Sequence, residues 1–175
     1  MFPKAVIDSG PLFDALVLNY DVRRVANGQR PKFASRYASI LDGALRNEAA
    51  QRRFLGLLGS IREKLTTSHV IAELYGLEKI RLVLYGPDRY NFWRVSIDLL
   101  MQWRIEETLI RLLDLASNDS LRICLPEIGV TDTGPIELAT RQGCVLITRD
   151  ERTLARQARI RQVDCRLVEE LLPFV

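Results

Sequence analysis

Four acidic residues of the chain occupy positions where a charged side chain is unfavourable unless something compensates it. Asp8 ends the apolar run AVI, and Asp150 comes two residues after the apolar run CVLIT. Glu73 lies on or beside the apolar stripe of one helical pattern, and Asp132 opens another. We therefore treat these four residues as candidates for a shared chemical role.

Carboxylates brought together at one place repel each other, and some of them stay protonated unless a cation neutralises them. Mg²⁺ and Mn²⁺ accept carboxylate oxygens and water in octahedral geometry and need few protein ligands. In sites with two such ions, the ions stand roughly 3.5–4 Å apart and hold both the attacking water and the leaving oxygen of a phosphodiester. The four acids therefore predict a site for Mg²⁺ or Mn²⁺ and the hydrolysis of phosphodiester bonds.

Each acid also has an ordinary structural explanation. An Asp between a strand and a helix is a favoured N-cap, and an acid near a helix N-terminus meets a favourable dipole. A Glu on an amphipathic helix commonly lies at the boundary of its apolar face. For any one of the four this explanation is the better one, so the metal-site hypothesis depends on the four acids acting together.

Short apolar runs alternate with helical patterns along the chain, and together they indicate a parallel sheet covered on both faces. The expected strands are 4–7, 64–67, 121–125, 144–148 and 163–166. The expected helices are 12–19, 34–61 with a break near 46–47, 68–84, 92–117, 131–142 and 150–158, with a loop at 21–34. The carboxyl ends of parallel strands form the edge where such folds bind ligands, and Asp8 and Asp150 both fall at this edge.

These segments resemble the PIN-domain family. The first family motif, a strand that ends in Asp followed by Ser or Thr, resembles VIDSGPLF, and the second, a helix that carries Glu, resembles TTSHVIAEL. The third and fourth motifs, an Asp that opens a helix and a strand that ends in T-x-D, resemble VTDTGPIELATRQGCVLITRD. The residues that match the motifs are Asp8, Ser9, Glu73, Asp132, Thr148 and Asp150.

The resemblance implies a three-layer α/β/α fold with a central parallel sheet of about five strands. A single PIN-like domain would then cover 1–175, with helical insertions at about 20–62 and 86–118. The resemblance implies catalytic and metal-binding roles for the four acids around Mg²⁺ or Mn²⁺, with Ser9 and Thr148 orienting them through hydrogen bonds. It also implies endonucleolytic cleavage of single-stranded RNA, as in the ribonuclease toxins of toxin–antitoxin pairs. Two alternatives share the same residues: an inactive PIN-like module for RNA binding or assembly, and a DNA nuclease.

Three arginines and one long helix are candidates for binding partners. Arg149, Arg152 and Arg156 recur at i, i+3 and i+7 beside the last acid, and such a row could bind RNA phosphates. An ordinary solvated helix face explains the same row. The helix expected at 92–117 is apolar over much of its circumference, which suits burial or a homodimer. The resemblance adds an antitoxin protein as a further partner.

Several other functions have no support in the sequence. No segment approaches the roughly 18 apolar residues of a membrane span, and the start MFPKAVID lacks the pattern of a signal peptide. We therefore expect a cytoplasmic protein without a membrane partner. The sequence has neither GxGxxG nor a P-loop, and a single histidine with three separated cysteines offers no zinc-ligand spacing.

Overall fold

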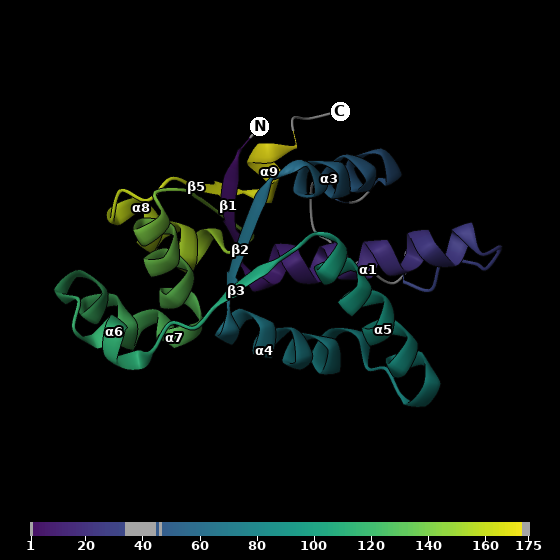
Figure 1. Ribbon diagram of the computed structural model, residues 1–175, viewed down its shortest axis with the longest axis horizontal. Helices are drawn as coiled ribbons and strands as arrows, with labels where there is room; N and C mark the ends of the chain where they lie inside the picture. The colour runs from purple at the N-terminus through teal and green to yellow at the C-terminus, as the bar shows by residue number, and fades with distance from the viewer. Residues whose placement is uncertain (1, 34–44, 46, 173–175) are drawn as a thin grey trace.

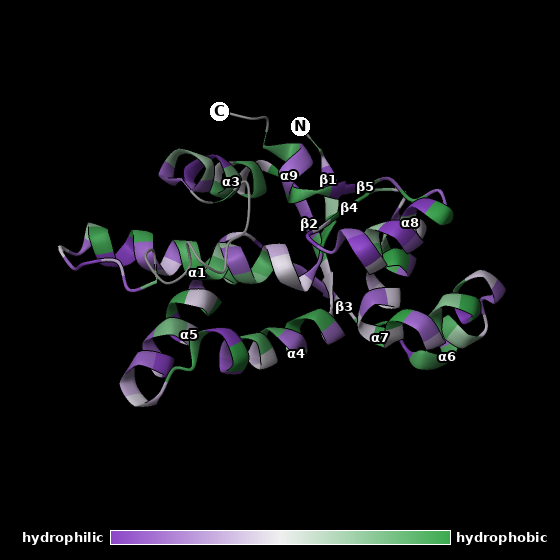
Figure 2. Ribbon diagram, turned by 180° about the vertical axis from the view of Figure 1, so that it is seen from behind, coloured by the Kyte–Doolittle hydropathy of each residue, from purple (hydrophilic) through white to green (hydrophobic). Residues whose placement is uncertain are grey.

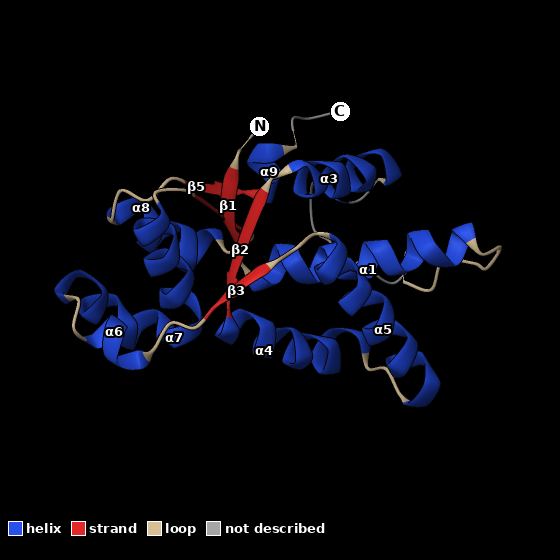
Figure 3. Ribbon diagram, viewed as in Figure 1, coloured by secondary structure: helices blue, strands red, loops and turns tan. Residues whose placement is uncertain are grey.

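A five-stranded, all-parallel sheet forms the centre of the protein, in the strand order β3-β2-β1-β4-β5. The structure is a computed structural model that describes residues 2–33, 45 and 47–172. The strands are β1 (Lys4–Ile7), β2 (Glu63–Thr67), β3 (Glu106–Thr108), β4 (Val145–Thr148) and β5 (Cys165–Leu167). The predicted α/β class, with about five parallel strands between layers of helices, is confirmed (Figure 3).

Helices cover both faces of the sheet. They are α1 (Ser9–Ala26), α3 (Glu48–Ser60), α4 (Ser68–Leu77), α5 (Gly86–Gln102), α6 (Leu112–Ala116), α7 (Asp119–Gln142), α8 (Arg156–Ile160) and α9 (Val168–Leu171). Two π-helical turns extend this set: η2 (Glu78–Leu82) follows α4, and η3 (Glu151–Ala155) precedes α8. In Figure 1 the sheet lies between α6, α7 and α8 on the left and α1, α3 and α5 on the right. The outer helices carry both hydrophilic and hydrophobic residues, as expected for helices with one face on a core (Figure 2).

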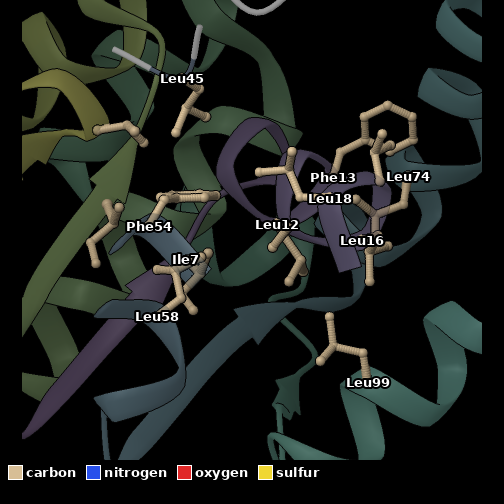
Figure 4. Packing of buried hydrophobic residues seen from close by; sticks show 14 of the residues in the cluster. Ile7, Leu12, Phe13, Leu16, Leu18, Leu45, Phe54, Leu58, Leu74 and Leu99 are labelled. Carbon is tan, nitrogen blue, oxygen red and sulfur yellow. The ribbon is translucent and has the colours of Figure 1, made fainter. Parts of the chain in front are cut away.

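Alternation along the central strands builds one hydrophobic core on each face of the sheet. Ala5 and Ile7 of β1 belong to the core formed with α1, α3, α4 and α5 (Figure 4). Val6, between them, belongs to the core formed with α6, α7 and α8. Successive side chains of a strand point to opposite faces, so a strand covered on both faces is usually rich in apolar residues. The apolar runs of β1 and β4 fit this pattern, whereas β2 also buries a lysine and two threonines.

The loop expected at 21–34 is wrong in its first part, because α1 continues to Ala26. The buried carboxylate of Asp21 accepts hydrogen bonds from the backbone N–H groups of Lys32 (2.7 Å) and Phe33 (2.8 Å). Asp21, which was predicted to begin a loop, is therefore part of α1, and its carboxylate holds the backbone of residues 32–33 against this helix.

The single helix expected at 92–117 is also wrong. Helix α5 ends at Gln102, and Arg104 adopts a left-handed backbone conformation with φ of 51°. The chain then forms β3 and the short helix α6. The homodimer predicted through 92–117 stays a prediction, and α5 is the part of that range that forms a long helix.

The strand expected at 121–125 lies instead in α7. The side chain of Asn118 caps this helix by accepting hydrogen bonds from the backbone N–H groups of Ser120 and Leu121. The strand beside β2 is consequently β3. Of the helix expected at 34–61, the described part is α3, and residues 34–44 and 46 lie outside the described residues. No helix in the described part of the chain is both long and apolar enough to cross a membrane.

Candidate functional site

The four predicted acids come from elements that meet at the carboxyl edge of the sheet. Asp8 directly follows β1, and Asp150 lies two residues after β4, the strand that pairs with β1. Glu73 is in the second turn of α4, which begins as soon as β2 ends. Asp132 lies in α7, three residues after Gly129, whose φ of 78° and ψ of 177° interrupt the helix. Asp132 therefore stands in the first turn of a new helical segment, as the sequence predicted.

Asp8 is held by its neighbours through one carboxylate oxygen. Its Oδ2 atom accepts a hydrogen bond of 2.8 Å from the hydroxyl of Thr148, and that hydroxyl oxygen accepts one of 3.0 Å from the backbone N–H of Asp150. The other oxygen, Oδ1, is buried and has no hydrogen-bond partner in the described structure. Burial raises the pKa of Asp8 to about 6, against the lowering effect of the Thr148 and Ser9 hydrogen bonds. The charges of Glu73 and Asp150 raise it further.

Asp132 experiences the same group of charges. Burial is the main cause that raises its pKa to about 7, and Asp8, Glu73 and Asp150 each raise it further. The structure thus brings all four predicted acids close enough for their charges to interact, although they are up to 142 positions apart in the sequence (150 minus 8). Repulsion of this kind is relieved either by protonation or by a cation.

Glu73 and Asp150 differ in how their carboxylates are used. The Oε2 atom of Glu73 is buried without a hydrogen-bond partner among residues 2–33, 45 and 47–172. Asp150 is the N-cap of η3, and its Oδ1 atom accepts a hydrogen bond of 2.9 Å from the backbone N–H of Thr153. The ordinary N-cap explanation therefore holds for Asp150, and it coexists with the electrostatic coupling to Asp8 and Asp132.

The donor set fits a hard divalent cation in its chemistry. All four groups are carboxylates, and two of them, Asp8 and Glu73, hold a buried oxygen without a protein partner. Oxygen donors of this type suit Mg²⁺ and Mn²⁺. The described residues contain no group of three or more metal-binding side chains around one point. The residues fit the ion by charge and donor type.

The raised pKa values predict that the stability of the metal-free protein falls with rising pH. Between the ordinary pKa of 3.8 and the raised values of about 6 for Asp8 and about 7 for Asp132, the folded state binds more protons than the unfolded chain. Stability is therefore lost from about pH 4 to about pH 7. For Asp8 the difference corresponds to at most about 3 kcal/mol in the free energy of unfolding.

Urea unfolding at pH 4 and pH 8 in EDTA measures this loss. We expect the loss to be smaller in Asp8→Asn, which removes the titrating group, and unchanged in Asp98→Asn, which alters an exposed acid on α5. The same loss in the wild type and in Asp8→Asn would contradict the prediction.

The three arginines that were predicted to form one row differ in their exposure to solvent. The side chain of Arg149 is only 17% exposed, and its Nη1 atom lies 2.8 Å from Oδ2 of the buried Asp14. Arg152 and Arg156 are exposed. The last two arginines are therefore accessible to a polymer, whereas Arg149 turns toward α1.

Two networks around buried acids were not predicted from the sequence. Asp14 pairs with Arg149 from within an almost wholly apolar stretch of α1, where an acid needs a partner, and this is the signal that could have identified it. Glu78 is 1% exposed and lies 2.7 Å from Arg89, and it also accepts hydrogen bonds from Leu84 and Trp93. We assign this second network to the packing of η2 against α5.

Comparison with models of known protein families gave no match, and a search of curated proteins gave none either. The relation to the PIN-domain family therefore stands as a proposal based on the motifs and on the position of the acids.

Proposed function

We propose that the chain is a metal-dependent endonuclease that cleaves single-stranded RNA. The observation that supports this best is the electrostatic coupling of Asp8, Glu73, Asp132 and Asp150, two of which have a buried oxygen without a protein partner. These four residues would hold Mg²⁺ or Mn²⁺. When bound, such an ion activates a water molecule and stabilises negative charge on the phosphate.

The residues around the acids have separate tasks in this proposal. The Thr148 hydroxyl occupies Oδ2 of Asp8 and thereby leaves Oδ1 as the oxygen available to a cation. The Ser9 backbone N–H also supports the Asp8 carboxylate. The exposed arginines Arg152 and Arg156 would bind the phosphate backbone on the helical segment that starts beside Asp150. The choice of RNA, and a role as a toxin with a cognate antitoxin, follow from the motif resemblance.

The proposal is tested with the wild-type chain and a panel of single-stranded RNA and DNA substrates, in Mg²⁺, in Mn²⁺ and in EDTA. We expect internal cleavage of RNA that depends on the metal and stops in EDTA. A melting experiment provides a second measurement, because a ligand that binds only the folded state raises the melting temperature. We expect this rise with Mn²⁺ to be larger at pH 8 than at pH 5, because the raised pKa values of Asp8 (about 6) and Asp132 (about 7) leave both groups protonated at pH 5. Cleavage of DNA alone would replace the proposed substrate and retain the chemistry.

One observation favours a second function, a PIN-like module that binds RNA or assembles without catalysis. The carboxylates are coupled, yet within the described ranges no three metal-binding side chains are gathered around one point. This module would bind RNA in EDTA as well as in Mn²⁺ and would show no rise in melting temperature with either metal. Metal-dependent cleavage by the wild type would eliminate it.

A further inference from the structure

A buried ion pair involves Arg149, the residue that directly precedes Asp150. Asp14 of α1 is fully buried, and its Oδ2 atom lies 2.8 Å from Nη1 of Arg149. The Nε atom of the same arginine lies 3.9 Å from a carboxylate oxygen of Glu169 in α9. The aliphatic part of the Arg149 side chain lies beside Gly10, in the first turn of α1. Arg149 thus connects the end of β4 with both α1 and α9.

Each member of this pair lies close in the sequence to one of the four acids. Asp14 follows Asp8 by six residues on the helix that begins at the end of β1, and Arg149 directly precedes Asp150. Two other contacts join the same segments. The backbone N–H of Asp8 donates to the carbonyl of Ile147 (3.0 Å), and the Thr148 hydroxyl links Asp8 to the backbone of Asp150.

The acids themselves push these segments apart. Asp8 and Asp150 follow two neighbouring parallel strands, so their like charges repel across the junction between β1 and β4. A charge-assisted hydrogen bond within a buried pair is short and geometrically specific. It holds residue 149 against α1 and thereby opposes this repulsion.

We infer that Asp14 and Arg149 form a positioning pair that fixes Asp150 relative to Asp8, so that both carboxylates can bind one divalent cation. This inference rests on the proposed metal-dependent function. It differs from the role in RNA binding predicted for Arg149, because the guanidinium acts on the acids through the backbone of residues 148–150. Contacts that orient metal ligands from behind commonly change metal affinity about 10- to 100-fold when they are removed.

The test is equilibrium binding of Mn²⁺, measured by the electron paramagnetic resonance signal of the free ion, which does not depend on cleavage. The proteins are the wild type, Asp14→Asn, Arg149→Met and the double variant. We expect each single variant to bind Mn²⁺ about 10- to 100-fold more weakly. We expect the double variant to bind no more weakly than the singles, because two residues that act through one contact have non-additive effects. Arg149→Lys, which keeps the charge without the planar fork, should fall between Arg149→Met and the wild type.

Arg159→Met serves as the matched control, because Arg159 forms an exposed ion pair of 2.8 Å with Glu170 of α9. We expect this variant to bind Mn²⁺ as the wild type does. Circular dichroism checks that each variant is folded, and the double variant contains no buried unpaired charge from this pair, so it tests the inference even where a single variant unfolds.

Four outcomes distinguish the inference from its alternatives. Folded variants with lower melting temperatures and wild-type Mn²⁺ affinity would show a pair that only stabilises the fold, and would overturn the inference. Additive losses in the double variant would do the same. Weaker RNA binding in Arg149→Met, with normal Mn²⁺ binding and normal behaviour of Asp14→Asn, would assign Arg149 to RNA. A wild type that binds no Mn²⁺ would overturn the proposed function, and the inference with it.

Discussion

Asp8→Asn is expected to lower the rate of metal-dependent cleavage at least about 10³-fold while the protein stays folded. The removed carboxylate is the one that combines near-complete burial, coupling to Glu73 and Asp150, and an oxygen without a protein partner. Charge stabilisation by a bound metal is worth several kcal/mol in the transition state. Each factor of ten in rate corresponds to about 1.4 kcal/mol, so the loss of this stabilisation lowers the cleavage rate by about three orders of magnitude or more. The measurement is the initial rate of RNA cleavage in Mn²⁺ and in Mg²⁺.

The fold of Asp8→Asn should be preserved because Asn retains an oxygen that can accept the Thr148 hydrogen bond. The substitution also removes a charge that repels Glu73 and Asp150. The melting temperature of the variant at pH 8 without metal should therefore be at least that of the wild type. The matched control is Asp98→Asn, at an exposed acid of α5 that pairs with Arg23 and should leave cleavage unchanged. Full activity of a folded Asp8→Asn variant would overturn the assignment of the site.

Phe92→Ala is expected to lower the free energy of unfolding by about 3–5 kcal/mol, the usual range for the loss of a buried aromatic side chain. Phe92 of α5 is fully buried. Its ring centroid lies 5.6 Å from that of Tyr20, 6.2 Å from that of Phe33 and 6.4 Å from that of Phe13. Because these rings come from α1 and the chain that returns from it, the substitution leaves a cavity at the junction of three segments. Urea unfolding monitored by circular dichroism measures the change.

Tyr90→Ala is the control for this prediction, since Tyr90 lies two positions earlier on the same helix and is 70% exposed. We expect it to change the free energy of unfolding by no more than about 0.5 kcal/mol, as is usual for surface positions. A loss below about 1 kcal/mol in Phe92→Ala would mean that the aromatic cluster does not hold α5 against α1.

The parts of the fold that were predictable are those in which local pattern and burial agree. β1 and β4 contain the apolar runs AVI and VLI, which are typical of strands covered on both faces. β3 has the sequence Glu-Glu-Thr, and its strand character comes from pairing with β2, which no local pattern encodes. The run LRICL at 121–125 was short and apolar, so its periodicity could not distinguish a strand from a helix. The capping side chain of Asn118 was the signal that favoured the helix.

The same distinction applies to the candidate site. Three of the acids lie beside a strand end or a helix start, and Glu73 lies in the second turn of α4, so local motifs were enough to select these candidates and Thr148, which the structure places on Asp8. Asp14 and Arg149 are 135 positions apart, and their contact exists only because β1 and β4 are neighbours in the sheet. The spacing of Arg149, Arg152 and Arg156 predicted one helix face, but the first of them precedes η3 and points toward α1. Spacing along the sequence predicts which residues share a helix face, but it does not predict where that helix begins after the strand.

The central place of β1 in the sheet has a consequence for the time at which the acidic centre can exist. β1 pairs on one side with β2, Ala5 opposite Lys64, and on the other with β4, where Ala5 lies opposite Val145. During synthesis the first strand is made long before its second neighbour, and contacts between such distant segments form slowly. The ribosome must release the chain beyond residue 148 before Thr148 can reach Asp8. A nascent chain therefore remains without a complete acidic centre until β4 and Asp150 have been made and released.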